Sequence, residues 1–351
     1  MVDTTAPLPL DDANLTLTAS MTDQILGSSL TTAPPVLMPQ HAAALALRHF
    51  GVTGELTSLT SERDLNFRLT TAQGTYVLKL ANAAEPPEVT AFQTAALLHL
   101  VASPLPVPRV IRCLDGATEA VTPHGILRLL TYLHGRPLHQ TPRSPAQCAA
   151  MGTVAARLSL GLQGFDHPAA DHVLQWDIKQ AAALRPLLPY ITDDLRPLAT
   201  ETLNRFDRDL APQLPGLRAQ VVHNDLNPHN LLADPDDPAH ITGILDFGDM
   251  VRTPLICDAA VAASYHIDPN CAWDSLQTFA SAYHAILPLT ATEAALLRDL
   301  TETRMLTTLA IASARAARYP KNAAYILRNV PAAAAGLRAL AAAPRTALDL
   351  S

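Results

Sequence analysis

Two segments of the chain decide its fold: VVHNDLNPHNLL (residues 221–232) and GILDFGD (residues 243–249). Each joins a short apolar run, typical of a buried strand, to polar side chains at fixed offsets. The residues between them, 234–240, include two prolines and are enough for one short hairpin. We therefore expect the polar ends of the two segments to lie side by side.

These polar side chains fit the requirements of phosphoryl transfer. That reaction needs a carboxylate that orients the attacking hydroxyl and accepts its proton, and oxygen ligands for the Mg²⁺ that holds the nucleotide phosphates. In the pattern H-x-D-x-x-x-x-N, Asp225 supplies the carboxylate and Asn230 one metal ligand, and Asp246 supplies another. Taken alone, H-x-D can be a strand-end cap and D-F-G is a common tripeptide, but the two at this distance favour a catalytic centre. We expect His223 to brace the loop by hydrogen bonds.

The same residues resemble a known family. HNDLNPHN (223–230) followed by DFGD (246–249) resembles the aminoglycoside phosphotransferase and choline kinase group of small-molecule kinases. SERDLNF (61–67) and RTPLICD (252–258) resemble the hydroxylysine kinase branch, and the similarity runs from about residue 40 to about residue 330. The resemblance implies an α+β, bilobal protein-kinase-like fold, with a small antiparallel-sheet N-terminal lobe and a large, mostly helical C-terminal lobe.

The chain divides by composition and periodicity. We expect a mobile tail over residues 1–35, a nucleotide-binding lobe over 36–130, an inter-lobe link over 131–135, and over 136–351 a helical lobe that carries the catalytic and acceptor sites. The expected strands cover residues 55–59, 66–70, 75–80, 109–114 and 125–130. The expected helices cover residues 41–50, 88–100, 144–162, 173–184, 193–210, 255–265, 272–287, 292–318 and 323–342.

Composition limits the classes of function. The 351 residues are enough for two lobes, and the net charge of −7 argues against a nucleic-acid-binding protein, which needs a basic face. Four scattered cysteines without a C-x-x-C pair indicate neither a zinc site nor a disulfide framework. Neither a secretory leader nor an apolar run long enough to cross a membrane is apparent, so we expect a cytoplasmic protein without a membrane partner. The sequence does not indicate the oligomeric state.

The N-terminal lobe contains the expected nucleotide contacts. Lys79 interrupts the apolar run YVLKL; it either lies on an exposed edge strand or, as the resemblance implies, reaches the nucleotide phosphates and pairs with a helix glutamate. Glu88 is the candidate partner, although an acid in the first turn of a helix is also favoured by the helix dipole. The resemblance implies that the backbone near Thr131 and Leu133 binds the purine. Such recognition leaves no side-chain signature, so ATP and GTP both remain open as donors, and GTP is the donor that the resemblance to the hydroxylysine kinase branch implies.

The loop at residues 61–66 stands where protein kinases have a glycine-rich phosphate loop, and it contains no glycine. We expect the side chains of Ser61 and Asn66 to help bind phosphate. Arg63 is either a further phosphate contact or a solvated loop arginine.

The residues after the second segment concern the acceptor. Only four residues separate Asp249 from the apolar run 254–263, which leaves no room for a long activation segment and favours a small-molecule acceptor. Arg252 is suited to grip a carboxylate, and Asp249 or Asp258 to face an ammonium group. Alternatively, Arg252 and Asp258 pair with each other or cap the helix that begins nearby. Asn227 reaches either the transferred group or its own backbone in an Asx-turn.

These observations predict a Mg²⁺-dependent kinase that transfers a nucleotide γ-phosphoryl group to the hydroxyl of an amino acid or amine, with 5-hydroxylysine as the best candidate. Homoserine, choline or ethanolamine, and aminoglycoside antibiotics are alternative acceptors. A non-catalytic, pseudokinase-like binding protein is the alternative from another class. It would require the loss of a catalytic residue, and Lys79, Asp225, Asn230 and Asp246 are all present.

Overall fold

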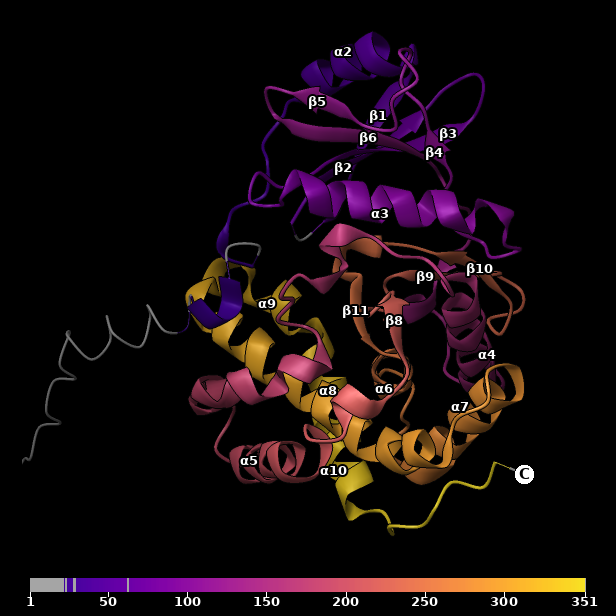
Figure 1. Cartoon of the computed structure of the whole chain (residues 1–351). Coiled ribbons are helices and arrows are strands. Elements are labelled where there is room, and N and C mark those ends of the chain that lie inside the picture. The colour runs from indigo at the N-terminus through magenta and orange to yellow at the C-terminus, as the bar shows by residue number, and fades with distance from the viewer. Residues whose placement is uncertain (1–21, 23, 28–29, 62, 351) are drawn as a thin grey trace, which may run out of the picture.

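The computed structural model describes residues 22, 24–27, 30–61 and 63–350, which form two lobes (Figure 1). The smaller lobe is a sheet with two helices, and the larger lobe is mainly helical. The chain passes from the first to the second directly after strand β6 (Gly125–Thr131). This is the bilobal architecture expected from the sequence.

The smaller lobe is built on an antiparallel sheet. Its strands follow the order β1-β2-β3-β6-β4, and β5 pairs with β6. Besides β6 they are β1 (Glu55–Leu59), β2 (Leu65–Thr70), β3 (Thr75–Leu80), β4 (Val110–Ile111) and β5 (Ala120–Thr122). Side chains of β2 alternate between the two faces, since Phe67 and Leu69 are buried whereas Arg68 and Thr70 are exposed.

Two helices cover this sheet. α2 (Pro39–Phe50) lies on its outer side, and α3 (Pro87–His99) lies between the sheet and the larger lobe (Figure 1). α2 ends at Gly51, whose positive φ of 69° lets its N–H reach the last helical carbonyls. Phe92 of α3 is fully buried in the core of the larger lobe, so α3 connects the two lobes.

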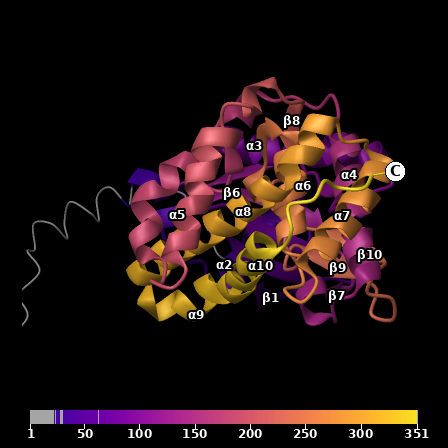
Figure 2. The same cartoon turned by 90° about the horizontal axis from the view of Figure 1, so that it is seen from below.

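The larger lobe surrounds the long helix α8. Its helices are α4 (Pro145–Gly161), α5 (Arg196–Arg205), α6 (Leu255–Ser264), α7 (Ala272–Ile286), α8 (Ala291–Arg318), α9 (Ala323–Ile326) and α10 (Val330–Ala342). α8 packs against α5, α6 and α10. In the view from below, it crosses the middle of the lobe (Figure 2). Among the described helices, none is both long and apolar enough to cross a membrane.

Two small antiparallel sheets carry the two segments that decide the fold. One joins β8 to β11 and the other has the order β10-β9-β7. Their strands are β7 (Arg136–Pro137), β8 (Ala219–Val222), β9 (Leu231–Ala233), β10 (Ile241–Ile244) and β11 (Val251–Pro254). The pair β9–β10 is the hairpin expected between the segments.

The structure differs from the sequence-based expectations where prolines intervene. No α-helix forms over 173–184: residues Ile178–Tyr190 form 3₁₀ turns, which include Pro186 and Pro189, two residues without an N–H donor. The helix expected at 323–342 is split into α9 and α10, and Pro331 lies in the first turn of α10, where proline is tolerated.

The N-terminal segment also differs in part from the expected mobile tail. Residues 24–27 are helical, and Leu26 and Leu30 are buried in the core of the larger lobe. Residues 1–21, 23 and 28–29 lie outside the described part of the chain.

Candidate functional site

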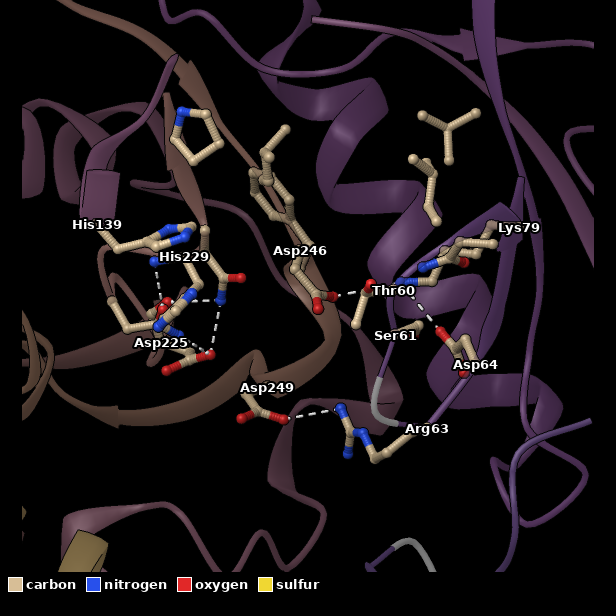
Figure 3. A pocket seen from close by; sticks show the side chains of 18 of the residues that line it. Thr60, Ser61, Arg63, Asp64, Lys79, His139, Asp225, His229, Asp246 and Asp249 are labelled. Atoms are coloured by element: carbon tan, nitrogen blue, oxygen red, sulfur yellow. Dashed lines mark hydrogen bonds and ion pairs between the residues drawn. The ribbon is translucent and has the colours of Figure 1, made fainter. Parts of the chain in front are cut away.

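A cavity of about 830 Å³ lies between the lobes and receives side chains from both. Asp225 and Asp246 both line it, as expected if the two segments form one site (Figure 3). Most of the other predicted site residues line it too: Ser61, Asn66, Lys79, Asn227, Asn230, Asp249, Thr131 and Leu133. Glu88, Arg252 and Asp258 do not.

The loop after β8 is fixed by buried hydrogen bonds. The N–H of Asp225 donates to Nδ1 of His223 over 3.2 Å, so Nε2 of the neutral ring donates to the carbonyl of Leu245 at 3.0 Å. Burial lowers the pKa of His223, which favours this neutral form. His223 therefore braces the loop, as predicted.

Asp258 supports the same loop from beneath. Asn224 has a positive φ of 62°, and its N–H donates to the carboxylate of Asp258 over 2.7 Å. Asp258 is 1% exposed, and burial raises its pKa to about 6. Its predicted role of facing an acceptor ammonium is wrong, because its carboxylate is enclosed beneath the loop.

The carboxylate of Asp225 is held from several sides. Its Oδ2 accepts hydrogen bonds from the side-chain amides of Asn227 at 2.8 Å and Asn230 at 2.7 Å. Its Oδ1 lies 3.4 Å from Nη2 of Arg304, a residue of α8. Burial and then the charge of Asp249 raise the pKa of Asp225 to about 7, although Arg304 opposes the shift. A carboxylate with this pKa can hold or release a proton near neutral pH.

Asn227 forms the Asx-turn that was one of its two expected roles. Its Oδ1 accepts the backbone N–H of His229 at 2.8 Å while its amide nitrogen contacts Asp225. Both ends of the side chain thus bind within the loop.

Lys79 of β3 lies between two carboxylates (Figure 3). Its Nζ is 3.0 Å from Asp64 and 3.3 Å from Asp246. Burial works to lower the pKa of Lys79, but the charges of Asp246 and Asp64 outweigh it and raise the pKa. In turn, Lys79 lowers the pKa of Asp246, which therefore stays ionised.

The predicted pairing of Glu88 with Lys79 is wrong. Glu88 is exposed in the first turn of α3, where it faces solvent, and the acidic partner comes instead from Asp64 before β2. α3 is held to the sheet by a different pair: Arg128 of β6, the cross-strand neighbour of Lys79, donates to Gln93 at 2.9 Å.

A second ion pair crosses between the lobes. Nη2 of Arg63 lies 2.9 Å from the carboxylate of Asp249 (Figure 3). Burial works to lower the pKa of Arg63, but the charges of the surrounding acids, Asp249 first, together outweigh it and raise the pKa. Arg63 is therefore not a solvated loop residue, and Asp249 already has a cationic partner.

Arg252 lies away from the cavity. Its guanidinium pairs with Asp166 and Asp171 on the surface of the larger lobe. The prediction that it grips an acceptor carboxylate is wrong, because β11 directs it to these two acids, and it does not pair with Asp258 either.

The side of the cavity formed by the smaller lobe has its own polar atoms. Oδ1 of Asn66 is buried without a hydrogen-bond partner among the described residues. In the link, the N–H of Thr131 donates to the carbonyl of Arg109, and that of Tyr132 to the carbonyl of Thr75. Leu133, two residues beyond the end of β6, also lines the cavity.

The donors present fit a magnesium ion. The side chain of Asp246 is 50% exposed in the cavity and ionised, and Asn230 turns its nitrogen to Asp225, which leaves its oxygen for another partner. In the described part of the chain, no three His, Cys, Asp or Glu side chains are placed so that they alone could hold a metal ion. Magnesium commonly uses one or two carboxylates, with waters and substrate phosphates completing its shell.

Sequence reasoning missed Arg304. Its guanidinium is 1% exposed and also donates to the carbonyl of Trp176 at 2.5 Å and to the hydroxyl of Tyr265 at 3.2 Å. The available signal is spacing, because Arg304 follows Leu296 and Leu300 at four-residue intervals on the apolar stripe of its helix. A charge on a buried stripe indicates a partner inside the protein.

Comparisons with known proteins agree with this geometry. The chain matches the model of the phosphotransferase enzyme family over residues 55–297. Hydroxylysine kinase of Mus musculus is 27% identical over 332 residues, with 85% of this chain and 88% of that protein covered. Homoserine kinase of Methylobacillus flagellatus is 29% identical over 232 residues, with 65% of this chain and 69% of that protein covered.

Solved structures share the fold. Amicoumacin kinase in complex with AMP-PNP and Ca²⁺ aligns with a TM-score of 0.63 and 15% identity, covering 84% of this chain and 93% of that one. The family match spans well over half of the chain, both lobes included. The chain therefore belongs to the phosphotransferase enzyme family and has its bilobal, kinase-like fold.

Proposed function

We propose that this enzyme transfers the γ-phosphoryl group of ATP or GTP, with Mg²⁺, to the hydroxyl of an amino acid, and that 5-hydroxylysine or a close analogue is the acceptor. One observation carries the proposal: Asp225, with a pKa of about 7, shares a cavity with Lys79 and the ionised Asp246. The similarity to hydroxylysine kinases along most of the chain supports the choice of acceptor.

Each residue has a distinct part. Asp225 orients the acceptor hydroxyl and takes its proton, while Asn230 and Asp246 hold the metal. When bound, Mg²⁺ would neutralise charge on the phosphoryl oxygens. Lys79 contacts the nucleotide phosphates, and the backbone at Leu133 the purine.

A screen for release of nucleoside diphosphate tests the proposal. It combines ATP or GTP with 5-hydroxylysine, homoserine, choline, ethanolamine and an aminoglycoside. We expect turnover with 5-hydroxylysine, and with homoserine as the second candidate because homoserine kinases are also similar to this chain. Release that does not exceed the acceptor-free rate for any compound would contradict the proposal.

Thermal melting separates an enzyme from a binding protein that does not use the nucleotide. Mg²⁺ with the donor nucleotide should raise the melting temperature by mass action. An unchanged melting temperature with both nucleotides would contradict nucleotide binding.

A further inference from the structure

The chain that leads into the smaller lobe joins the two lobes a second time, away from the link. This strap, residues 30–37, begins at Leu30, which is 4% exposed in the core of the larger lobe, and ends at Leu37, which is buried in the core of the smaller lobe. In Figure 1 the strap descends on the left, whereas β9, which pairs with β7 after the link, lies on the right. The lobes are therefore connected by the chain on two sides.

Hydrogen bonds hold the strap to both lobes. The hydroxyl of Tyr319, directly after α8, donates to the carbonyl of Thr31 at 2.9 Å. On the smaller lobe, the side-chain amide of Asn82 donates to the carbonyl of Ala33 at 3.2 Å and to that of Arg63 at 2.9 Å. Asn82 is 3% exposed, so it ties the strap to the loop before β2 from inside the protein. The strap is therefore fixed once to each lobe.

The side chain of Leu30 forms part of the cavity wall. Because the neighbouring Thr31 is bound to Tyr319, Leu30 lies near the C-terminal end of α8. The same helix lines the cavity from Arg304 onwards, and Arg304 contacts Asp225. Leu30 therefore stands at the far end of the wall that α8 forms from the proposed base.

The space for an acceptor is limited. A cavity of about 830 Å³ lies within the range that holds one drug-sized ligand, about 300–1,000 Å³. In the proposed reaction a nucleotide at Lys79 and the link takes one part of it. The acceptor then occupies the part between Asp225 and Leu30, where its hydroxyl can reach the base.

We propose that Leu30, held in place by the strap, sets the upper size limit of the acceptor, so that a free amino acid fits and an acceptor extended beyond one residue does not. The side chain is apolar, so it contributes bulk to the wall and no hydrogen bond. Steric overlap with the wrong ligand is one of the two ways in which a site discriminates. The inference rests on the proposed kinase function and names the size class of its acceptor.

Acceptors that differ only in length test this limit. 5-Hydroxylysine is compared with the tripeptide that carries an alanine on each of its ends, which adds about 3.5 Å at each end. In wild type, kcat/KM should be lower for the tripeptide. Leu30→Ala should raise the ratio of kcat/KM for the tripeptide to that for the amino acid by about tenfold or more, the discrimination typical of one methylene in a pocket. The KM of the nucleotide should stay unchanged.

Leu26→Ala is the matched control, because Leu26 is buried in the same core and does not line the cavity. It removes the same atoms and should keep the wild-type ratio. Leu30→Met conserves the volume of the side chain and should also keep the ratio. Tyr319→Phe removes the hydrogen bond to the strap without changing a lining residue, and it should raise the ratio several-fold.

Three results would overturn the size limit. They are a wild type that uses the tripeptide as well as the amino acid, a Leu30→Ala variant with the wild-type ratio, and an equal change in Leu26→Ala and Leu30→Ala. If no acceptor supports turnover in any variant, the kinase function fails instead, and the wall keeps an independent measurement.

That measurement is the access of a small quencher to Trp176, which lines the cavity. The N-terminal segment lies close to it, because a Cβ on Gly27 would come within 2.8 Å of the side chain of the adjacent Gln175. In a Trp273→Phe background, acrylamide should quench the fluorescence of Trp176 more strongly when Leu30 is replaced by alanine. The Leu26→Ala control should be quenched as the parent is. Equal quenching in all three proteins would reject Leu30 as a closing wall.

Discussion

Removing the charge of Arg304 should shift the pH dependence of catalysis. Arg304→Gln removes the guanidinium group whose Nη2 lies 3.4 Å from Oδ1 of Asp225. The positive charge of this group opposes the rise in the pKa of Asp225. As the proposed base, Asp225 must be ionised to accept the hydroxyl proton, so activity should fall as the pH drops through its pKa. Without Arg304 that pKa is higher, and the loss of activity begins at a higher pH.

The size of the shift follows from the contact distance. Two unit charges at this separation interact by about 5 kcal/mol at an effective dielectric constant of 20, as an upper bound. An opposite charge within 4–6 Å typically changes a carboxyl pKa by about 1–3 units. From a starting pKa of about 7, a rise of one unit lowers the ionised fraction at pH 7.5 about threefold, and a rise of two units about 25-fold.

The assay is kcat/KM for the acceptor between pH 6 and pH 10 at saturating Mg²⁺ and nucleotide. A bound Mg²⁺ would lower the pKa in both proteins, so the difference between wild type and variant is the quantity to compare. Arg298→Gln is the control: Arg298 is another buried arginine of α8, but it pairs with Glu302. The control should lower the melting temperature without moving the acid limb. An acid limb in Arg304→Gln that coincides with wild type would refute the assigned coupling.

Four further substitutions address the other roles. Asp225→Ala should abolish turnover and leave nucleotide affinity largely intact, as measured by isothermal titration; near-normal turnover would remove Asp225 as the base. Asp246→Ala should weaken nucleotide binding only when Mg²⁺ is present, and equal weakening with EDTA would argue against a metal ligand. Asp64→Ala should raise the KM of the nucleotide several-fold, because it frees Lys79 from one of its two carboxylates. Glu88→Ala should leave this KM unchanged. A larger rise in Glu88→Ala than in Asp64→Ala would show that Glu88 is the functional partner of Lys79.

The catalytic loop could be predicted from sequence because its geometry is local. Asp225 and Asn230 are five positions apart on one loop, and the hairpin that follows returns the chain to Asp246. Contacts made by distant elements left no such signal. Nothing in the spacing distinguishes Asp64 from Glu88, because the partner of Lys79 depends on how the loop before β2 packs against β3.

The acceptor side was the least predictable. Arg252 is next to the motif in sequence, yet the strand that carries it points it at Asp166 and Asp171. Arg304 lies 79 residues beyond Asp225, and only the packing of α8 beneath the loop brings them together. Sequence proximity to a motif was therefore a poor guide to which arginine contacts Asp225.

The pairs Arg63–Asp249 and Lys79–Asp246 each have their cation on the smaller lobe and their anion on the helical lobe. Any hinge motion about residues 131–135 that moves the two lobes apart must break both ion pairs. Dissolved ions screen such attractions, least where the charges are sheltered from water. The rate at which the lobes open, and with it the rate of product nucleotide release, should therefore depend on the ionic strength of the solution.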